Sequence, residues 1–355
     1  MTNDERSLLL DTLTRIFADH CDQKTVETAK QTGFARDLWN VLEQAEVPLI
    51  GVPESAGGAG GTWSDAAAVL HLAGKFSAPV PLAETGFIAG WMLSASGMSV
   101  PRGPLAVGPA RREDALTLRR GAGGWIASGT LARVPYASVA TRVIALASDG
   151  TRDYVVAVDP AACEIAPGKN LASEPRNSVR LNDVALRADD VAQAGPGVTR
   201  ASLHERGAAA RAILMAGALE RCLELATSYA AQRVQFGRPI AQFQAIQQDL
   251  ARLAGEVAAA RAAAMSAANA LERGDAGVAV ASAKIRCGEA ALLGSAIAHQ
   301  VHGAIGATRE YLLHHSTTRL AAWRGEFGSD AQWAESLGKQ MIARGADAYW
   351  AALTE

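Results

Sequence analysis

Three long alanine-rich helical patterns in the C-terminal half of this 355-residue chain constrain its fold most strongly. They run over residues 208–232, 240–273 and 277–302, and we expect a further helical stretch near residues 331–353. Alanine has the highest helix propensity, and small side chains allow helix backbones to approach closely. Residues 198–355 are therefore predicted to form a four-helix bundle.

The middle of the chain, residues 101–197, has a different pattern. Its short β-prone runs are separated by Gly, Asp and Pro, and lie at residues 105–107, 115–118, 125–127, 141–146 and 154–158. Several strands at such spacing predict a small β-barrel or sandwich. Because no helix-length periodic segment interrupts them, a doubly wound nucleotide-binding fold is not expected.

Residues 1–100 again carry helical signals. Apolar residues recur at three- and four-residue spacing from Leu8 to Phe17. The glycine-rich loop at residues 52–61 lacks the Lys-Ser/Thr ending of a phosphate-binding loop, so we interpret it as an interhelical turn with Thr62 or Ser64 capping the next helix. The predicted fold class is α+β, mostly α, with helical, β and helical-bundle domains in that order.

Composition excludes several classes of function. The hydrophobic fraction is 49%, the charged fraction is 20% and the formal net charge is −2, so a core is expected and a nucleic-acid surface is not. Four scattered cysteines indicate reduced thiols, and the polar N-terminus is unlike a signal peptide, so a cytoplasmic location is expected. The spacing of His302, His314 and His315 does not predict a metal site.

The corner between the first two bundle helices, residues 233–244, is a candidate anion site. Gly237 is predicted to end one helix and Pro239 to begin the next, which would leave backbone N–H groups free. Arg233 and Arg238 would add donors that match a phosphate, although solvated arginines are the common alternative.

A second glycine-containing turn follows the helix that ends near His302. Gly303 and Gly306 allow the backbone to turn tightly and to approach another group closely. The residues themselves leave two interpretations open: a helix C-cap followed by a loop, or a ligand contact.

Both motifs resemble the acyl-CoA dehydrogenase family. The corner is similar to that family's Arg-x-Gln-Phe-Gly-x-Pro-Ile segment followed by Phe-Gln, and the turn to its Gln-x-x-Gly-Gly-x-Gly segment, with Ala304 departing from the second glycine. The resemblance implies FAD as cofactor, bound at a subunit interface. It assigns flavin contacts to Arg233, Gln235, Phe236, Gln244, Gln300, Gly303 and Gly306.

The resemblance also implies a glutamate base that removes the α-proton of an acyl thioester while the β-hydrogen leaves as hydride to the flavin. Glu326 is the candidate, although it lies one position early and Phe327 occupies the expected place. Arg324 beside it would favour the charged form and so oppose a raised pKa. Glu205, near the position used by some members, is a second candidate, and a partner residue is a third.

Two family segments that hold the flavin ring, Thr-Glu-Pro-x-x-Gly-Ser-Asp and a Trp-Ile-Thr/Ser strand end, are missing. Residues 108–114 and 129–134 stand where they would fall, and the Trp125 strand is interpreted as core. The chain is thus predicted to keep the half of the flavin site donated to a neighbour.

The leading hypothesis is FAD-dependent oxidation of an acyl-CoA to the α,β-enoyl-CoA, alone or with a longer partner subunit. The resemblance implies an electron-transfer flavoprotein as acceptor and a homo- or hetero-oligomer, dimer or tetramer. The alternatives are a non-catalytic partner subunit and a flavin-dependent monooxygenase on the same fold.

Overall fold

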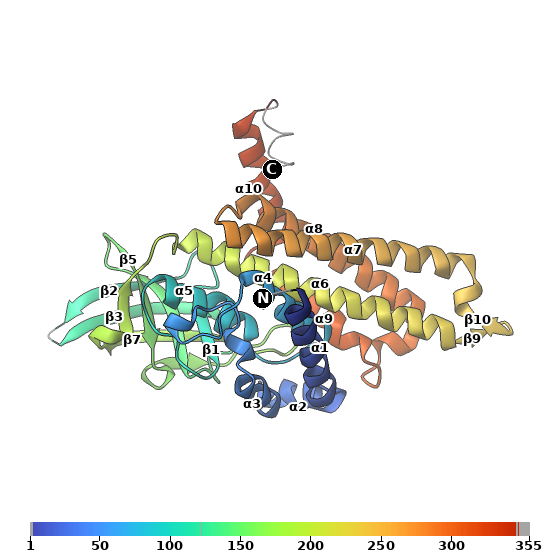
Figure 1. Ribbon diagram of the computed structural model, residues 1–355, viewed down its shortest axis with the longest axis horizontal. Helices are drawn as coiled ribbons and strands as arrows, with labels where there is room; N and C mark the ends of the chain where they lie inside the picture. The colour runs from blue at the N-terminus through green and yellow to red at the C-terminus, as the bar shows by residue number, and fades with distance from the viewer. Residues whose placement is uncertain (1–2, 122, 346, 348–355) are drawn as a thin grey trace.

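The computed structural model describes residues 3–121, 123–345 and 347, which form three regions (Figure 1). The first is helical. Its elements are α1 (Asn3–His20), α2 (Gln23–Thr32), α3 (Arg36–Gln44), α4 (Trp63–Lys75), η3 (Ala83–Gly90) and α5 (Trp91–Ala95), with 3-10 turns at η1 (Val47–Leu49) and η2 (Glu54–Ala56). Thr62 caps α4 in a reciprocal capping box with Asp65, as the sequence predicted.

The second region is one mixed sheet. Its strands are β1 (Leu105–Gly108), β2 (Ala115–Gly121), β3 (Gly124–Pro135), β4 (Arg142–Ser148), β5 (Asp153–Val158), β6 (Glu164–Ala166), β7 (Arg176–Leu186) and β8 (Val191–Gln193), with 3-10 turns η4 (Pro160–Ala162) and η5 (Ala188–Asp190). The order is β6-β7-β3-β2-β4-β5-β8, and β1 pairs in parallel with β4. Trp125 is buried against Tyr154 and Arg120, in agreement with its interpretation as strand core.

The third region contains α6 (Arg200–Gln232), α7 (Gln244–Arg273), α8 (Gly277–His302), α9 (Leu313–Arg324) and α10 (Asp330–Arg344), with 3-10 turns η6 (Ile240–Gln242) and η7 (Gly303–Ala307). Helices α6 to α9 form a four-helix bundle, and α10 projects from it (Figure 1). The first three helices are the expected ones, but the fourth is α9 and not the predicted stretch near residues 331–353. The sequence did not indicate α9, whose polar residues obscure its helical period. The predicted final helix begins as expected, but residues 346 and 348–353 lie outside the described part.

The corner after α6 differs from its prediction. Val234–Gln235 (β9) pairs with Arg238–Pro239 (β10) in a two-stranded hairpin, with Phe236 and Gly237 at positive φ. Helix α6 ends at Gln232, Pro239 precedes the short 3-10 turn η6, and α7 begins only at Gln244. The predictions that Gly237 ends one helix and that Pro239 begins the next are therefore wrong, because a tight turn uses the same Gly and Pro residues as helix termini.

The N-terminal helices dock tightly on the bundle through α4 and α6. A Cβ added at Gly217 would lie 1.9 Å from the His71 carbonyl oxygen, and one at Gly74 would lie 2.1 Å from that of Leu214. These two glycines bring the backbones together and fix how the first region meets the third. No helix in the described residues is long and apolar enough to cross a membrane.

Candidate functional site

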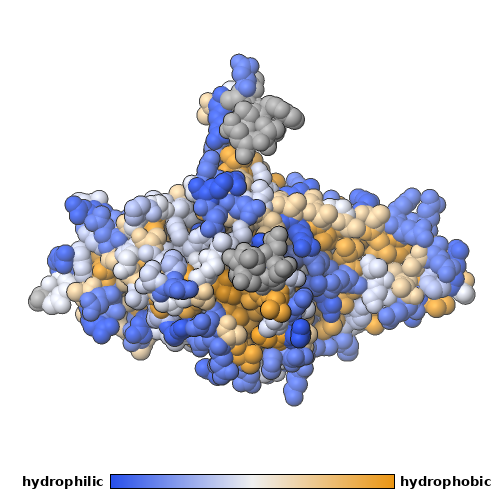
Figure 2. All heavy atoms as spheres, viewed as in Figure 1, coloured by the Kyte–Doolittle hydropathy of each residue, from blue (hydrophilic) through white to orange (hydrophobic). Residues whose placement is uncertain are grey.

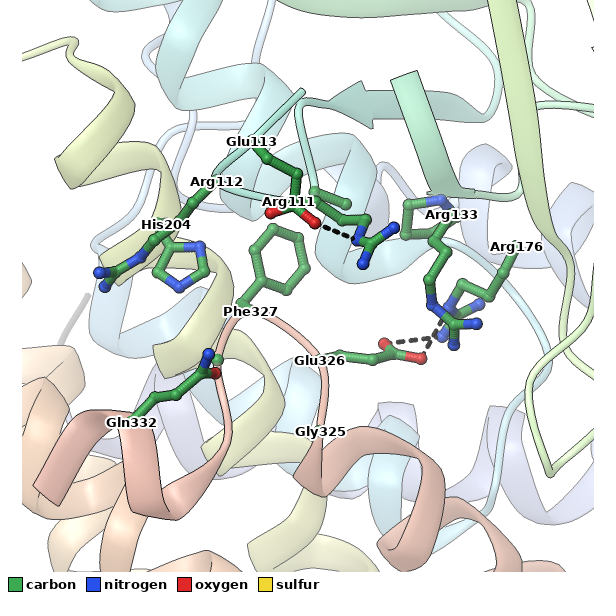
Figure 3. A pocket seen from close by; sticks show the side chains of 13 residues that line it. Arg111, Arg112, Glu113, Arg133, Arg176, His204, Gly325, Glu326, Phe327 and Gln332 are labelled. Carbon is green, nitrogen blue, oxygen red and sulfur yellow. Dashed lines mark hydrogen bonds and ion pairs between the residues drawn. The ribbon is translucent and has the colours of Figure 1, made fainter. Parts of the chain in front are cut away.

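A cavity of about 290 Å³ lies where the β region meets the bundle (Figure 3). The segments that line it come from the loop after β1, the end of β3, the start of β7, α6, the loop after α9, and α10. They contribute Ala110, Arg111, Arg112, Glu113, Arg133, Pro135, Arg176, His204, Gly325, Glu326, Phe327, Gly328 and Gln332. Residues 108–114 and 129–134, which stand where the family's ring-binding segments would fall, thus contribute to the same cavity as the loop that carries Glu326.

Two buried arginines form hydrogen-bonded ion pairs with the carboxylate of Glu326. Arg176 Nε and Nη2 donate to its two carboxylate oxygens at 2.7 and 3.0 Å, and Arg211 Nε donates at 2.6 Å. Asn170 adds an amide donor at 3.1 Å. Every oxygen of this carboxylate is therefore engaged by the chain itself.

The same arginines continue into a larger buried network. Arg211 also binds Glu84 at 2.5 Å, and Arg176 binds Glu174 at 3.0 Å. Arg319 of α9 pairs with Glu174 at 3.1 Å. These residues come from all three regions, so alternating charges join the N-terminal helices, the sheet and the bundle.

This environment determines the acidity of Glu326. Burial alone would raise the pKa of its carboxyl, but Arg176 and Arg211 outweigh burial and lower that pKa to about 2. A carboxylate held this way is a weak proton acceptor at neutral pH. Arg324 was expected to favour the charged form of Glu326, but it pairs instead with Asp330 at 2.5 Å. Arg176 and Arg211 have that effect.

Phe327 occupies the place where the resemblance expects a base. Its ring is 3% exposed and packs so closely on α6 that a Cβ at Gly207 would lie 2.2 Å from it. Trp333 donates its indole N–H to the Phe327 carbonyl at 2.9 Å. Lys284 caps the end of α9 by donating to the Arg324 carbonyl at 2.6 Å, which holds the start of the loop that carries Glu326 and Phe327.

His204 and Glu205 follow each other on α6 but face different surroundings. His204 lines the cavity, and its buried Nε2 has no hydrogen-bond partner among the described residues. Burial, with Arg112 and Lys284 nearby, lowers the pKa of His204 to about 4, so it is neutral. Glu205 does not line the cavity, although burial raises its pKa.

The corner at residues 233–244 is exposed, unlike the cavity. Phe236 is 92% exposed at the tip of the hairpin, and Arg233 and Arg238 form no ion pair with any described residue. Gln235 and Gln244 are also exposed. Figure 2 shows polar and apolar residues mixed at this end of the bundle, which is the far end from the sheet. A partner molecule could reach all of these side chains.

The glycine turn lies at the same end. Tyr229, in the last turn of α6, stacks on His302 with ring centroids 4.7 Å apart, and Gly303 follows directly. Gln300 and Gly303 are exposed, and a side chain at Gly303 would meet nothing within 4 Å. Gly306 is packed instead, because a Cβ there would lie 2.8 Å from that of His302. The structure thus brings the two sequence motifs together.

The motifs and the cavity lie at opposite ends of α6. His204 lines the cavity near the first turn, and Arg233 ends the helix, a separation of roughly 44 Å at 1.5 Å per residue. A flavin dinucleotide is much shorter than that. The corner of one chain therefore cannot serve the cavity of the same chain.

Known proteins agree with this architecture. The acyl-CoA dehydrogenase N-terminal domain family matches residues 3–99, and the acyl-CoA dehydrogenase C-terminal domain family matches residues 195–341. Acyl-CoA dehydrogenase IpdE2 of Mycobacterium tuberculosis is 31% identical over 323 residues, which cover 88% of this chain and 89% of that protein. The chain belongs to the acyl-CoA dehydrogenase family, whose members are FAD-dependent oxidoreductases acting on CH–CH bonds.

Solved structures share the fold over almost the whole length. A chain of the ChsE4-ChsE5 complex from Mycobacterium tuberculosis superposes with a TM-score of 0.87 at 24% identity, covering 98% of this chain and 99% of that one. A variant of the Tcur3481-Tcur3483 steroid ACAD gives 0.84 at 25% identity, covering 97% and 99%. Butyryl-CoA dehydrogenase from Megasphaera elsdenii gives 0.84 at 18% identity, covering 96% and 99%.

The residues of the buried ion network around Glu326 were not predicted from the sequence. Arg211 and Arg319 are charged residues within otherwise small or apolar helical stretches, and this pattern could have indicated buried ion pairs. Arg176 and Glu174 follow a loop of ordinary polar composition, so no local pattern distinguishes them.

Proposed function

We propose that this chain is one subunit of a heteromeric acyl-CoA dehydrogenase that oxidises an acyl-CoA thioester to its α,β-enoyl-CoA. In this proposal the chain donates its corner and glycine turn to FAD, and a longer partner supplies the flavin-ring pocket and the base. The observation that carries the proposal is the separation between two sites: an exposed corner whose arginines form no ion pair with any described residue, and a cavity in which the carboxylate of Glu326 is ion-paired to Arg176 and Arg211.

In this proposal the residues of the corner and the glycine turn have different roles in binding FAD. Arg233 and Arg238, with no competing carboxylate among the described residues, would bind the flavin diphosphate. Phe236 would cover an apolar part of the cofactor, and Gln235, Gln244 and Gln300 would donate hydrogen bonds to it. FAD, when bound, accepts the hydride. Gly303 would let the backbone approach the dinucleotide closely.

The cavity of this chain supports a non-catalytic role for the chain itself. Phe327 stands where the resemblance expects the base, and the carboxylate of Glu326 accepts hydrogen bonds from Arg176 and Arg211. The relatives named as complexes of two proteins, ChsE4-ChsE5 and Tcur3481-Tcur3483, support a two-protein assembly. An electron-transfer flavoprotein remains the proposed acceptor for the assembled enzyme.

Flavin stoichiometry tests this proposal. The chain is purified alone, and also together with the product of any adjacent acyl-CoA dehydrogenase gene. We expect no flavin absorbance and no stabilisation by added FAD for the chain alone, and one FAD per pair of subunits in the complex. One FAD for every copy of the chain alone, with acyl-CoA turnover, would show that it is a self-sufficient dehydrogenase and overturn the proposal.

A further inference from the structure

A cluster of metal-ligand side chains lies away from the cavity, where α2 meets the start of α9. Glu27 comes from α2, and His314 and His315 come from the first turn of α9. One ligand atom from each of the three residues lies within 4.8 Å of the others. The two histidines are adjacent in sequence, but Glu27 lies 287 residues before His314. The sequence pattern alone therefore does not predict the site.

Two of the three distances between ligand atoms match a tetrahedral metal centre. Zinc bonds of 2.0–2.1 Å to nitrogen and oxygen place neighbouring ligand atoms roughly 3.3 Å apart. Glu27 Oε1 lies 3.2 Å from His314 Nε2 and 3.4 Å from His315 Nε2. Two imidazoles and one carboxylate form a donor set suited to zinc, with a fourth position for water.

The hydrogen bonds around the cluster leave lone pairs for a metal. His314 Nδ1 lies 2.7 Å from the Tyr311 carbonyl oxygen, which can only accept, so that nitrogen carries the proton and Nε2 is an acceptor. His315 is 3% exposed, and neither ring nitrogen has a hydrogen-bond partner among the described residues.

In this structure Lys30 supplies the positive charge beside Glu27. Its Nζ lies 2.6 Å from Glu27 Oε1 and 3.1 Å from His314 Nε2. A bound cation would displace this ammonium, and the flexible lysine stem could carry it into solvent, since its side chain is already 22% exposed. Lys30 is thus a competitor that weakens the site.

We propose that Glu27, His314 and His315 bind a divalent transition-metal cation, best fitted by Zn²⁺, which clamps α2 to α9. The clamp joins the first region to the helix that carries Arg319 and Trp323 of the buried network. Its role is structural, and it is independent of how flavin is held.

Zinc binding to the metal-free chain, measured by calorimetry and by competition with a chromophoric chelator, tests the site. We expect one Zn²⁺ per chain, with affinity at least about tenfold weaker in Glu27→Gln and His314→Asn and stronger in Lys30→Met. The control His20→Asn changes an exposed histidine at the end of α1 and should bind like the wild type. Circular dichroism checks that each variant is folded.

Cobalt provides a spectroscopic version of the same test. Co²⁺ should give the visible bands of a tetrahedral site in wild type and in Lys30→Met, and these bands should be lost in Glu27→Gln. The proposal is overturned if neither wild type nor Lys30→Met binds either metal saturably, or if Glu27→Gln binds as tightly as wild type.

Discussion

Arginines at two places in this molecule have opposite surroundings. At the cavity, Arg176 and Arg211 are fully buried and each binds two glutamates. At the far end of the bundle, Arg233 and Arg238 are exposed and form no ion pair with any described residue. The charges of the first pair are compensated by glutamates within the fold, whereas those of the second pair are accessible to a ligand.

This contrast separates stability from binding. Removing one member of a buried ion network leaves an uncompensated charge, which costs far more than any exposed pair contributes. Removing an exposed arginine costs the fold little but removes donors from a phosphate. Substitutions in the two regions should therefore affect different measurements.

The largest effect is expected for Glu326→Gln. Because Arg176 and Arg211 would be left partly unpaired in the interior, the free energy of unfolding should fall by about 3–5 kcal/mol, measured by urea denaturation. Glu113→Gln is the matched control, since Glu113 lines the same cavity but its side chain is 62% exposed. A Glu326→Gln complex that keeps wild-type stability and loses turnover would identify Glu326 as the base instead.

The next effect is expected at the corner. Arg233→Ala should weaken FAD binding by the assembled complex by about 1.5–3 kcal/mol, the range for a hydrogen bond to a charged group, with unfolding unchanged. Flavin released on dilution and followed by fluorescence would measure this loss. Arg273→Ala, an exposed arginine at the opposite end of α7, is the control. Equal flavin affinity in the two variants would remove the corner from the cofactor site.

The sequence suggests candidates at the corner more readily than at the cavity, for a physical reason. The corner and the glycine turn are local motifs, so contiguous residues are enough to propose Arg233, Phe236 and Gly303 as flavin contacts, although the hairpin at the corner was not expected. In the Glu326 network single hydrogen bonds join residues as far apart as Asn170 and Glu326, which are 156 positions apart, and only the fold brings them together. The same holds for Glu27 and the two histidines, whereas α6 to α8 were visible from their long alanine patterns.

Lowering the pH should reduce the stability that the residues at the cavity contribute more than it affects the corner. Glu326 has a folded-state pKa of about 2 against an ordinary 4.5, so its contribution is complete above about pH 4.5 and is lost as the pH falls toward 2. The pKa of His204 falls from 6.5 to about 4, so the unfolded chain takes up a proton first and stability decreases between those values.

The His204 contribution can be measured separately. Between pH 6.5 and 4 the contribution of His204 to the slope of the unfolding free energy against pH should approach about 1.4 kcal/mol per pH unit, and His204→Phe should reduce that slope. His20→Phe, at an exposed position, should retain the wild-type slope. Urea midpoints across the range measure it, and identical slopes in wild type and His204→Phe would contradict the assignment.

The smallest effect is expected for an arginine that combines features of both regions. Arg111 lines the cavity, yet its side chain is 49% exposed and pairs with exposed Glu113 at 2.8 Å. Exposed pairs contribute at most about 1 kcal/mol, so Arg111→Ala should change the unfolding free energy by less than that and leave the flavin content of the complex unchanged. A double-mutant cycle with Glu113→Ala isolates the pair. A coupling as large as the Glu326 effect would mean that burial does not decide which arginines stabilise the fold, and lost flavin would mean that this cavity holds cofactor after all.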